Sequence, residues 1–290
     1  HAADSGPRLI GITVEARPDQ VTPDHLARLF RLGVTKIELG VQILDDRVLA
    51  FNDRGHDLAA TVRAIAAVRA AGMKVGAHLL LGMPGAMPAW DIASAERLLL
   101  DPDLTPDHLK LYFCEMFRED FMKPRLASLI ASGVWRPLDH EARMELLGAI
   151  LPRVPSRVRI SRIGRKHADD ELAIPTRRMS RGDAEAHFGC RCVRCREPRA
   201  DATWDGTMRI VEERVSEREW HLEARPPQSD VCLGLLRLHV ELGRATVREL
   251  HVYGVETPLG EKGPHQHRGV GKRLLDLAET RARDEGAERV

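Results

Sequence analysis

Five short apolar segments within the first 165 residues alternate with amphipathic ones, and this alternation is the strongest constraint on the fold. The apolar segments are rich in Val, Ile and Leu and bounded by Gly or Pro: Arg8–Val14, Lys36–Val41, Lys74–Leu81, Leu109–Phe113 and Val158–Ile163. Between them, Asp24–Leu32 and Leu58–Ala71 repeat apolar residues at helical spacing. Strands separated by helices favour a parallel sheet, so the pattern predicts an α/β fold, an open or partial (β/α) barrel rather than a doubly wound sheet. Functional residues are then expected at the carboxyl ends of the strands.

Composition narrows the class of protein. The chain has 290 residues and a formal net charge of +1, so a nucleic-acid partner would need a locally basic surface. Its longest apolar run, Val75–Met83, is interrupted by Gly76, His78 and Gly82 and is far shorter than the roughly 20 residues of a membrane-spanning helix. The five cysteines do not form the spread framework of a secreted disulfide domain, and no signal peptide opens the chain. These features predict a cytoplasmic protein without a membrane partner.

The composition changes between residues 150 and 200, a stretch that contains thirteen basic residues and only six acidic ones. Most of the basic residues are arginines, whose planar guanidinium groups suit phosphate oxygens. A phosphate-binding face and a solvated linker both fit this charge. Beyond residue 200, Thr207–Val215, Val231–His239 and Thr246–Val255 are predicted strands, followed by a helix over about 270–285. A second, smaller α/β domain is therefore expected.

A cysteine cluster lies inside the basic stretch, in the sequence His-Phe-Gly-Cys-Arg-Cys-Val-Arg-Cys from His187 to Cys195. Three thiolates at Cys190, Cys192 and Cys195 can share one tetrahedral zinc ion, with a histidine as the fourth ligand. His187 is the nearest candidate and His167 a weaker one. An iron–sulfur cluster and a set of unliganded cysteines are the alternatives. A zinc ion here would be structural and would tie the basic segment to its neighbours.

A glycine-containing loop, Gln266-His267-Arg268-Gly269-Val270-Gly271-Lys272, precedes the last predicted helix. Backbone N–H groups at such a helix start are open toward an anion, and the helix dipole favours a pyrophosphate there. The spacing resembles the loop with which acetyltransferases of the GNAT superfamily bind acyl-CoA. An ordinary glycine-rich helix start is the alternative.

Polar residues follow or end the first strands. Glu15 closes the first, Gln42 ends the second with Arg54 and His56 after it, and His78 lies in the third. Each alone is more often a cap than a ligand. At the carboxyl ends of barrel strands, however, they are expected to converge on one ligand.

Seven motifs in one order carry a family resemblance: Val-Glu-Ala-Arg-Pro-Asp, Gly-Val-Thr-Lys-Ile-Glu-Leu-Gly-Val-Gln, Asn-Asp-Arg-Gly-His, His-Leu-Leu-Leu-Gly-Met-Pro-Gly, Cys-Arg-Cys-Val-Arg-Cys-Arg-Glu, Arg-Glu-Leu-His-Val-Tyr-Gly and Gln-His-Arg-Gly-Val-Gly-Lys. Their order resembles the catalytic third subunit of Elongator, a radical S-adenosylmethionine enzyme with a GNAT-like domain. The resemblance implies a partial radical-SAM-type barrel over residues 1–150, a zinc-tied basic linker over 151–200 and a truncated GNAT-like domain over 201–290. It also implies a tRNA-modifying acyltransferase that uses acetyl-CoA and radical chemistry to build a carboxymethyl-type group on the 5-position of the wobble uridine.

The resemblance also implies roles for individual residues, although it assigns no catalytic residue. Glu15, Gln42 and Arg54 match S-adenosylmethionine ligands, and their carboxylate, amide and guanidinium groups suit its ammonium and carboxylate. The zinc ligands match Cys190, Cys192 and Cys195. The acetyl-CoA pyrophosphate loop matches Gln266, Arg268, Gly269, Val270, Gly271 and Lys272, and the tRNA-binding side chains are expected to be Arg157, Arg159, Arg162, Arg165 and Lys166.

The chain departs from the family pattern in three places. Cys114 is the only cysteine before Cys190, so the cysteines that hold the family's 4Fe-4S cluster are expected to precede residue 1. A tyrosine-bearing segment is expected after Val290, and Phe113-Cys114 stands where the family tends to have Pro-Thr. We therefore expect a fragment that lacks both ends and is inactive alone. The alternatives are a GNAT-type protein lysine acetyltransferase and a non-catalytic zinc-stabilised tRNA-binding module, and accessory subunits and a homodimer both stay open.

Overall fold

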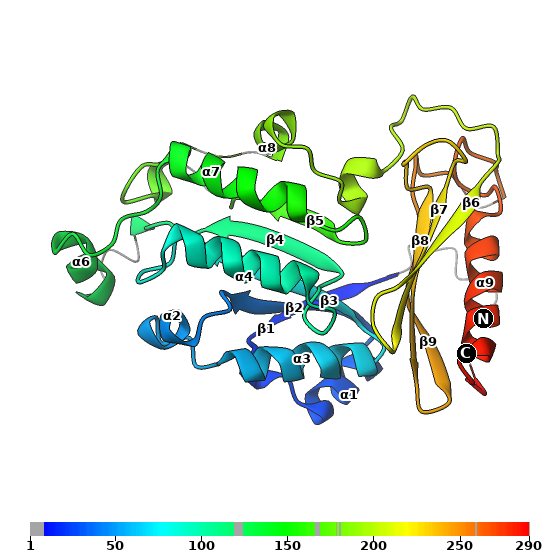
Figure 1. The fold of residues 1–290 in the computed structure, drawn as a ribbon, viewed down its shortest axis with the longest axis horizontal. Coiled ribbons are helices and arrows are strands. Elements are labelled where there is room, and N and C mark those ends of the chain that lie inside the picture. Colours follow the sequence, from blue (N-terminus) through cyan, green and yellow to red (C-terminus); the bar gives the residue numbers. More distant parts are fainter. Residues whose placement is uncertain are drawn as a thin grey trace.

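The computed structural model describes residues 9–118, 124–165, 169–177, 179, 181–258 and 260–289. Arg8, Lys166, His167 and Val290, named above, lie outside these ranges. Two sheets organise the molecule: a parallel one built from the first half of the chain and an antiparallel one near the carboxyl end (Figure 1). The predicted α/β fold with a parallel sheet is confirmed.

The parallel sheet has five strands in the order of the sequence. They are β1 (Ile12–Ala16), β2 (Val34–Gln42), β3 (Lys74–Leu81), β4 (His108–Phe113) and β5 (Arg159–Ile163), and every neighbouring pair is parallel. The first strand begins later than predicted, since the apolar side chains of Leu9 and Ile10 are exposed and precede it. Glu15 consequently lies inside β1, one residue from its end.

Residues alternate along the middle strands between an apolar and a polar face. In β2, Ile37, Leu39 and Val41 are buried in the main core, whereas Lys36 and Glu38 carry charge to the opposite face. The same period of two recurs in β3 and β4, where Val75, Ala77, Leu79, Leu109 and Leu111 join the core. The sheet therefore buries one face under helices and keeps a charged face on the other side.

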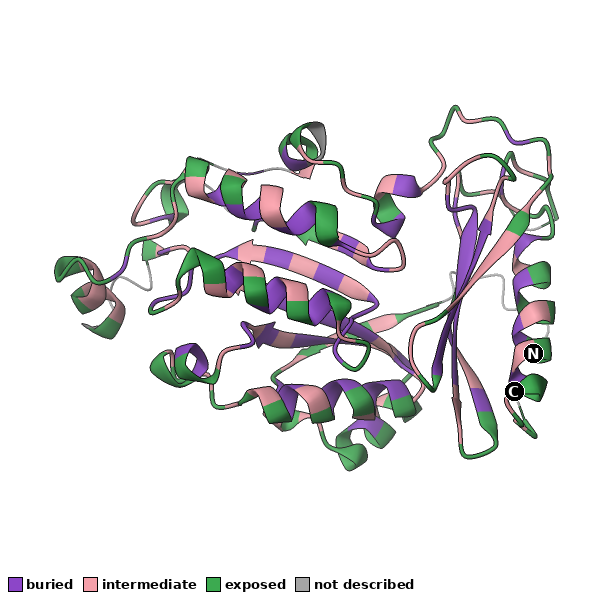
Figure 2. Ribbon diagram, in the orientation of Figure 1, coloured by how far each residue is buried: buried purple, intermediate pink, exposed green. Residues whose placement is uncertain are grey.

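Helices cover the apolar face, with α3 (Leu58–Ala70), α4 (Pro88–Leu100) and α7 (His140–Ile150) side by side across it and their buried residues turned toward the strands (Figures 1 and 2). Side chains of Thr22, Asp57 and Asp139 accept backbone hydrogen bonds at the starts of α1 (Pro23–Arg31), α3 and α7. The described residues of this half also form α2 (Asp46–Phe51), α6 (Pro124–Ala131) and α8 (Arg181–His187). No helix in the described ranges is long and apolar enough to cross a membrane.

The antiparallel sheet has the order β6 (Arg209–Arg214), β7 (Glu219–Arg225), β8 (Gly234–Glu241) and β9 (Arg244–Val252), and α9 (Val270–Asp284) packs on one face (Figure 1). The sequence predicted β6, β8, β9 and α9 but not β7. In β7, Trp220, Leu222 and Ala224 face α9, and the residues that alternate with them, Glu219, His221 and Glu223, are all buried. The sequence did not predict β7 because these three residues are polar or charged, and such side chains are rarely buried without partners.

The charged face of the antiparallel sheet packs against the amino ends of β3, β4 and β5. Arg248 of β9 donates to both carboxylate oxygens of Asp107, at 2.7 and 3.1 Å, and to Glu219 of β7 at 2.6 Å. Asp107 directly precedes β4, and it also accepts the backbone N–H of Val75 at 2.7 Å. Burial alone would raise the pKa of Asp107, but the charges of Arg248 and Arg237 hold it well below its usual range. At the interface between the two sheets, buried carboxylates are therefore neutralised by buried arginines.

We expect Arg248→Met to lower the free energy of unfolding by about 3–5 kcal/mol, because Asp107 and Glu219 would remain buried with reduced compensation. Arg283→Met is the control, since the Arg283 side chain is 68% exposed and pairs with Glu279 within α9. Urea unfolding at neutral pH, followed by circular dichroism, measures both. Equal losses in the two variants would contradict a central role for Arg248.

Candidate functional site

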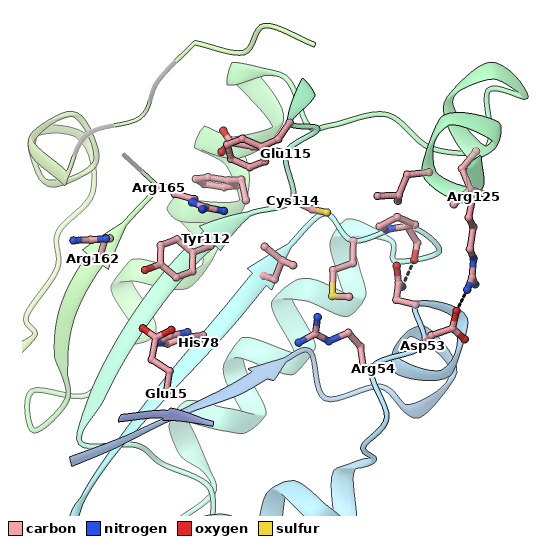
Figure 3. Close-up of a pocket in the computed structure, with 18 residues that line it drawn as sticks. Glu15, Asp53, Arg54, His78, Tyr112, Cys114, Glu115, Arg125, Arg162 and Arg165 are labelled. Atoms are coloured by element: carbon pink, nitrogen blue, oxygen red, sulfur yellow. Dashed lines mark hydrogen bonds and ion pairs between the residues drawn. The ribbon is translucent and has the colours of Figure 1, made fainter. Parts of the chain in front are cut away.

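A cavity of about 770 Å³ opens at the carboxyl ends of the parallel strands. Residues of β1, β3, β4, β5 and α6 and of the loop after α2 line it, as expected for a sheet of parallel strands. Figure 3 shows Glu15, His78 and Tyr112 grouped at one end, Arg125 and Asp53 paired at the other, and Arg54 between them. The polar lining residues are Glu15, Asn52, Asp53, Arg54, His78, Tyr112, Cys114, Glu115, Arg125, Arg162 and Arg165.

Arg54 offers hydrogen-bond donors that the described part of the chain does not use. Its Nε is buried and has no hydrogen-bond partner among the described residues. Burial and the nearby charge of Arg17 lower its pKa, and yet an arginine stays protonated. A buried, unpaired guanidinium edge is costly, so this geometry suits an anionic ligand group.

The side chains of Gln42 and Arg54 both lie close to Gly40. A Cβ built on Gly40 would lie 2.8 Å from Nε2 of Gln42 and 3.8 Å from Nη2 of Arg54, so only glycine leaves this space open. Gln42 has a φ of 69°, in the left-handed region, and this turns the chain at the strand end. His56, by contrast, sits between the carbonyls of Val41 and Arg54, at 3.3 and 3.2 Å, and fixes the loop instead of facing a ligand.

Glu15 lies at the cavity edge with 65% of its side chain exposed. Its Oε1 accepts a hydrogen bond from Nζ of Lys110 at 3.1 Å and lies 3.9 Å from Nε2 of His78. The structure therefore gathers Glu15, Gln42 and Arg54 at the same end of the sheet, as a carboxylate, an amide and a guanidinium. Such a set fits a ligand that carries both an ammonium and a carboxylate group. Sequence reasoning did not single out Lys110 as a functional residue.

The basic residues predicted to contact RNA separate into two groups. Arg157 pairs with Glu213 of β6 and Arg159 with Glu197, both at 2.7 Å, so Arg157 joins the two sheets and Arg159 binds the segment that follows the thiol cluster. Arg162 and Arg165 instead line the cavity, and the guanidinium of Arg165 stacks 4.7 Å from the centre of the Phe117 ring. Lys166 lies outside the described residues.

The three clustered cysteines can hold a metal ion. The sulfur atoms of Cys190, Cys192 and Cys195 all lie within 4.8 Å of one another. Nη2 of Arg181 donates to the sulfurs of Cys192 and Cys195, at 3.4 and 3.2 Å, which favours thiolates. His187 is not part of this group, because its Nδ1 faces the carbonyl of Asp183 at 2.7 Å and its ring is exposed.

The segment that carries these thiols bridges the two sheets. The N–H of Val193 donates to the carbonyl of Val158, just before β5. Arg196 pairs with Glu223 of β7 at 2.5 Å and donates to the carbonyl of Ser156 at 2.8 Å. A metal bound here would brace the junction between the halves.

The glycine loop starts α9 as predicted. Gly269 is the N-cap residue, with a φ of 85° and open space where a Cβ would stand, and Lys272 is exposed. Val270 is buried in the second core, and Gln266 and Arg268 bind backbone groups, Gln266 that of Thr257 and Arg268 that of Trp204. The polar side chains thus shape the loop, and the backbone N–H groups at the helix start are left for an anion.

Comparisons with known proteins agree with this architecture. The model of the radical SAM superfamily matches residues 2–93, which include the first three strands of the parallel sheet. The solved structure of archaeal Methanocaldococcus infernus Elp3 with an N-terminal deletion superposes with a TM-score of 0.84 and 26% identity, over 96% of this chain and 71% of that one.

Curated relatives narrow the assignment. The tRNA uridine(34) acetyltransferase of Dehalococcoides mccartyi is 33% identical over 96% of this chain and 65% of its own length. Elongator complex protein 3 of Saccharomyces cerevisiae is 30% identical over 98% of this chain and 55% of its own length. The chain is thus similar, over nearly its whole length, to Elongator complex protein 3 and to tRNA uridine(34) acetyltransferases, and it spans between about half and two thirds of the length of these relatives.

We expect Cys192→Ser to release bound metal and to destabilise the junction, because the site loses its buried central thiolate. Cys232→Ser is the matched control, since Cys232 is equally buried but lies outside the cluster. Metal content per chain after purification under reducing conditions measures the effect. Unchanged content in Cys192→Ser would remove the metal assignment.

Proposed function

We propose that the protein modifies the wobble uridine 34 of tRNA, building a carboxymethyl-type group on its 5-position from acetyl-CoA by S-adenosylmethionine radical chemistry. The relatives named tRNA uridine(34) acetyltransferase support this reaction. The observation that carries the proposal is the cavity itself, because Arg54, whose Nε has no partner among the described residues, lines one space together with Arg162 and Arg165.

The cavity residues fit the methionine end of S-adenosylmethionine. In the proposed arrangement, Arg54 binds its carboxylate, Glu15 its ammonium group, and Gln42 bridges over Gly40. S-adenosylmethionine held there would supply a 5'-deoxyadenosyl group able to take hydrogen from a C–H bond, once a one-electron donor from outside the cavity cleaved its C5'–S bond and released methionine. The cavity itself does not fit a 4Fe-4S cluster, because such a cluster needs several thiolates and Cys114 is the only cysteine among the described residues that line the cavity.

The RNA is proposed to approach the same opening. Arg162 and Arg165 lie exposed at its rim, where guanidinium groups can bind phosphates. These two arginines are better placed for tRNA than Arg157 and Arg159, which are engaged in ion pairs.

The second half is proposed to bind acetyl-CoA, with its pyrophosphate at the start of α9, and the thiol cluster is proposed to hold a structural zinc ion. Both assignments keep the predicted division into a barrel-like part over 1–150, a linker over 151–200 and a GNAT-like part over 201–290. The fourth zinc ligand stays unassigned between His187 and other donors.

The test uses the intact protein, purified without oxygen, with tRNA, acetyl-CoA and S-adenosylmethionine under reducing conditions. Mass spectrometry of the digested tRNA should show a 5-carboxymethyl-type uridine. Arg165→Gln should weaken tRNA binding and reduce the slope of log K against log salt by about 1, because one phosphate contact is lost. Arg31→Gln, at the end of α1 and away from the cavity, should change neither. Peptide lysine acetylation without tRNA, or no tRNA binding at low salt, would overturn the proposal.

Gly269→Glu should weaken acetyl-CoA binding strongly, because it adds a carboxylate beside the expected pyrophosphate. Gly286→Glu is the matched control: Gly286 follows the same helix, has a φ of 77° and has the same open space around its Cβ position. Backbone strain is therefore similar in both variants. Equilibrium binding of acetyl-CoA separates them, and equal affinities would count against this loop as the binding site.

A further inference from the structure

Four charged or polar side chains from four neighbouring strands lie together on the charged face of the parallel sheet, and two of them line the cavity. They are Glu15 of β1, Glu38 of β2, His78 of β3 and Lys110 of β4. Nε2 of His78 lies 3.0 Å from Glu38, and Nζ of Lys110 bonds to both Glu38 and Glu15. Glu15 belongs to the proposed cofactor site, whereas Glu38 and Lys110 have no role in it so far.

A glycine makes this cluster sterically feasible. Glu38 is in register with Gly76 on β3, where an added Cβ would lie 2.6 Å from Cγ of Glu38. Because Gly76 has no side chain, Glu38 crosses over β3 and reaches Lys110 on the strand beyond it. The contact between β2 and β4 therefore depends on a gap in the intervening strand.

The pair of Glu38 and Lys110 is a fixed charge pair. The side chain of Glu38 is only 4% exposed, and burial opposes its ionisation. Hydrogen bonds from His78, Lys110 and Lys36 nevertheless hold the pKa of Glu38 well below its usual range. Burial likewise opposes the charge of Lys110, but the two carboxylates raise its pKa. Both groups are thus ionised at neutral pH, and the Lys110 ammonium lies between the carboxylates of Glu15 and Glu38.

Glu15 differs from Glu38 in its freedom. It is 65% exposed, and its carboxylate has one hydrogen bond, from Lys110 at 3.1 Å. An exposed glutamate samples several rotamers, and ordering it on ligand binding costs side-chain entropy. The hydrogen bond from Lys110, which Glu38 holds in place, favours the rotamers of Glu15 that reach the ammonium group.

We propose that Lys110 is a positioning residue that fixes the carboxylate of Glu15 for the ammonium group of an S-adenosyl amino acid. This inference rests on the proposed function of the cavity. Lys110 does not touch the ligand in this arrangement. It acts through Glu15, and Glu38 and Gly76 set its place.

Two stable probes test the inference on the intact, anaerobically purified protein. S-adenosylhomocysteine carries the amino-acid end, and 5'-methylthioadenosine lacks it. Lys110→Met should weaken binding of S-adenosylhomocysteine about tenfold, the loss expected for one charge-assisted hydrogen bond, and leave 5'-methylthioadenosine binding unchanged. Glu15→Gln should show the same selectivity, and Lys110→Met should add little in the Glu15→Gln background.

Lys36→Met is the matched control, because Lys36 also pairs with Glu38, at 2.8 Å, but does not contact Glu15. It should bind both probes as the unaltered protein does. Should Lys110→Met fail to fold, the double variant Glu38→Gln with Lys110→Met removes both buried charges and is expected to keep the same probe selectivity.

Calorimetric titration distinguishes the outcomes. Weaker S-adenosylhomocysteine binding in Glu15→Gln but not in the Lys110 variants would overturn the role of Lys110 while the proposed site stands. Equal weakening of both probes in Lys110→Met would make Lys110 a general structural residue. Failure of the unaltered protein to bind either probe would overturn the proposed cofactor site and this inference with it.

Discussion

The position of the antiparallel sheet depends on the guanidinium group of Arg248, which binds Asp107 at the start of β4 and Glu219 of β7 at the same time. Asp107 also accepts the N–H of Val75, so one carboxylate fixes the amino ends of β3 and β4 and receives the second sheet. Arg237 extends the network, since its Nε lies 2.8 Å from Glu249 and 3.3 Å from Asp107. Buried ion pairs contribute little net stability compared with apolar packing, but they tolerate few alternative arrangements. We infer that they set the orientation of the two halves.

This interface explains why the basic stretch between residues 150 and 200 does not act as one surface. Arg157 and Arg159 lie at the amino end of β5 and face the antiparallel sheet, whereas Arg162 and Arg165 lie at its carboxyl end and face the cavity. From Arg157 to Arg165 an extended chain covers about 25 Å, enough to carry one charge run from the junction to the opening. Charge counted along the sequence therefore overstates the surface available to RNA.

The sequence predicted the elements whose physics is local. All five parallel strands, α1, α3 and α9 follow from apolar periodicity, and the glycine loop and the thiol cluster follow from short spacings. What it could not predict are contacts across long separations. A glutamate such as Glu219 is expected at the surface. It is buried here because Arg248, 29 positions later in the sequence, neutralises its charge. His187 is close to the cysteines in sequence, yet its helix turns the ring toward Asp183.

The sequence analysis did not single out the charged cluster beside the cavity, yet the alternation of residues along β2 indicates it. Lys36, Glu38, Gly40 and Gln42 share one face, opposite the buried Ile37, Leu39 and Val41. Along that single face, Lys36 and Glu38 belong to the charged cluster with Lys110, and Gly40 leaves room for the side chains beside it. Gln42 then supplies the amide of the candidate site. A face that is charged yet half-buried needs partners on the neighbouring strands, and β3 and β4 supply His78 and Lys110 at the same level. The alternation thus predicts a paired polar interior, although only the register, through Gly76, decides which charges meet.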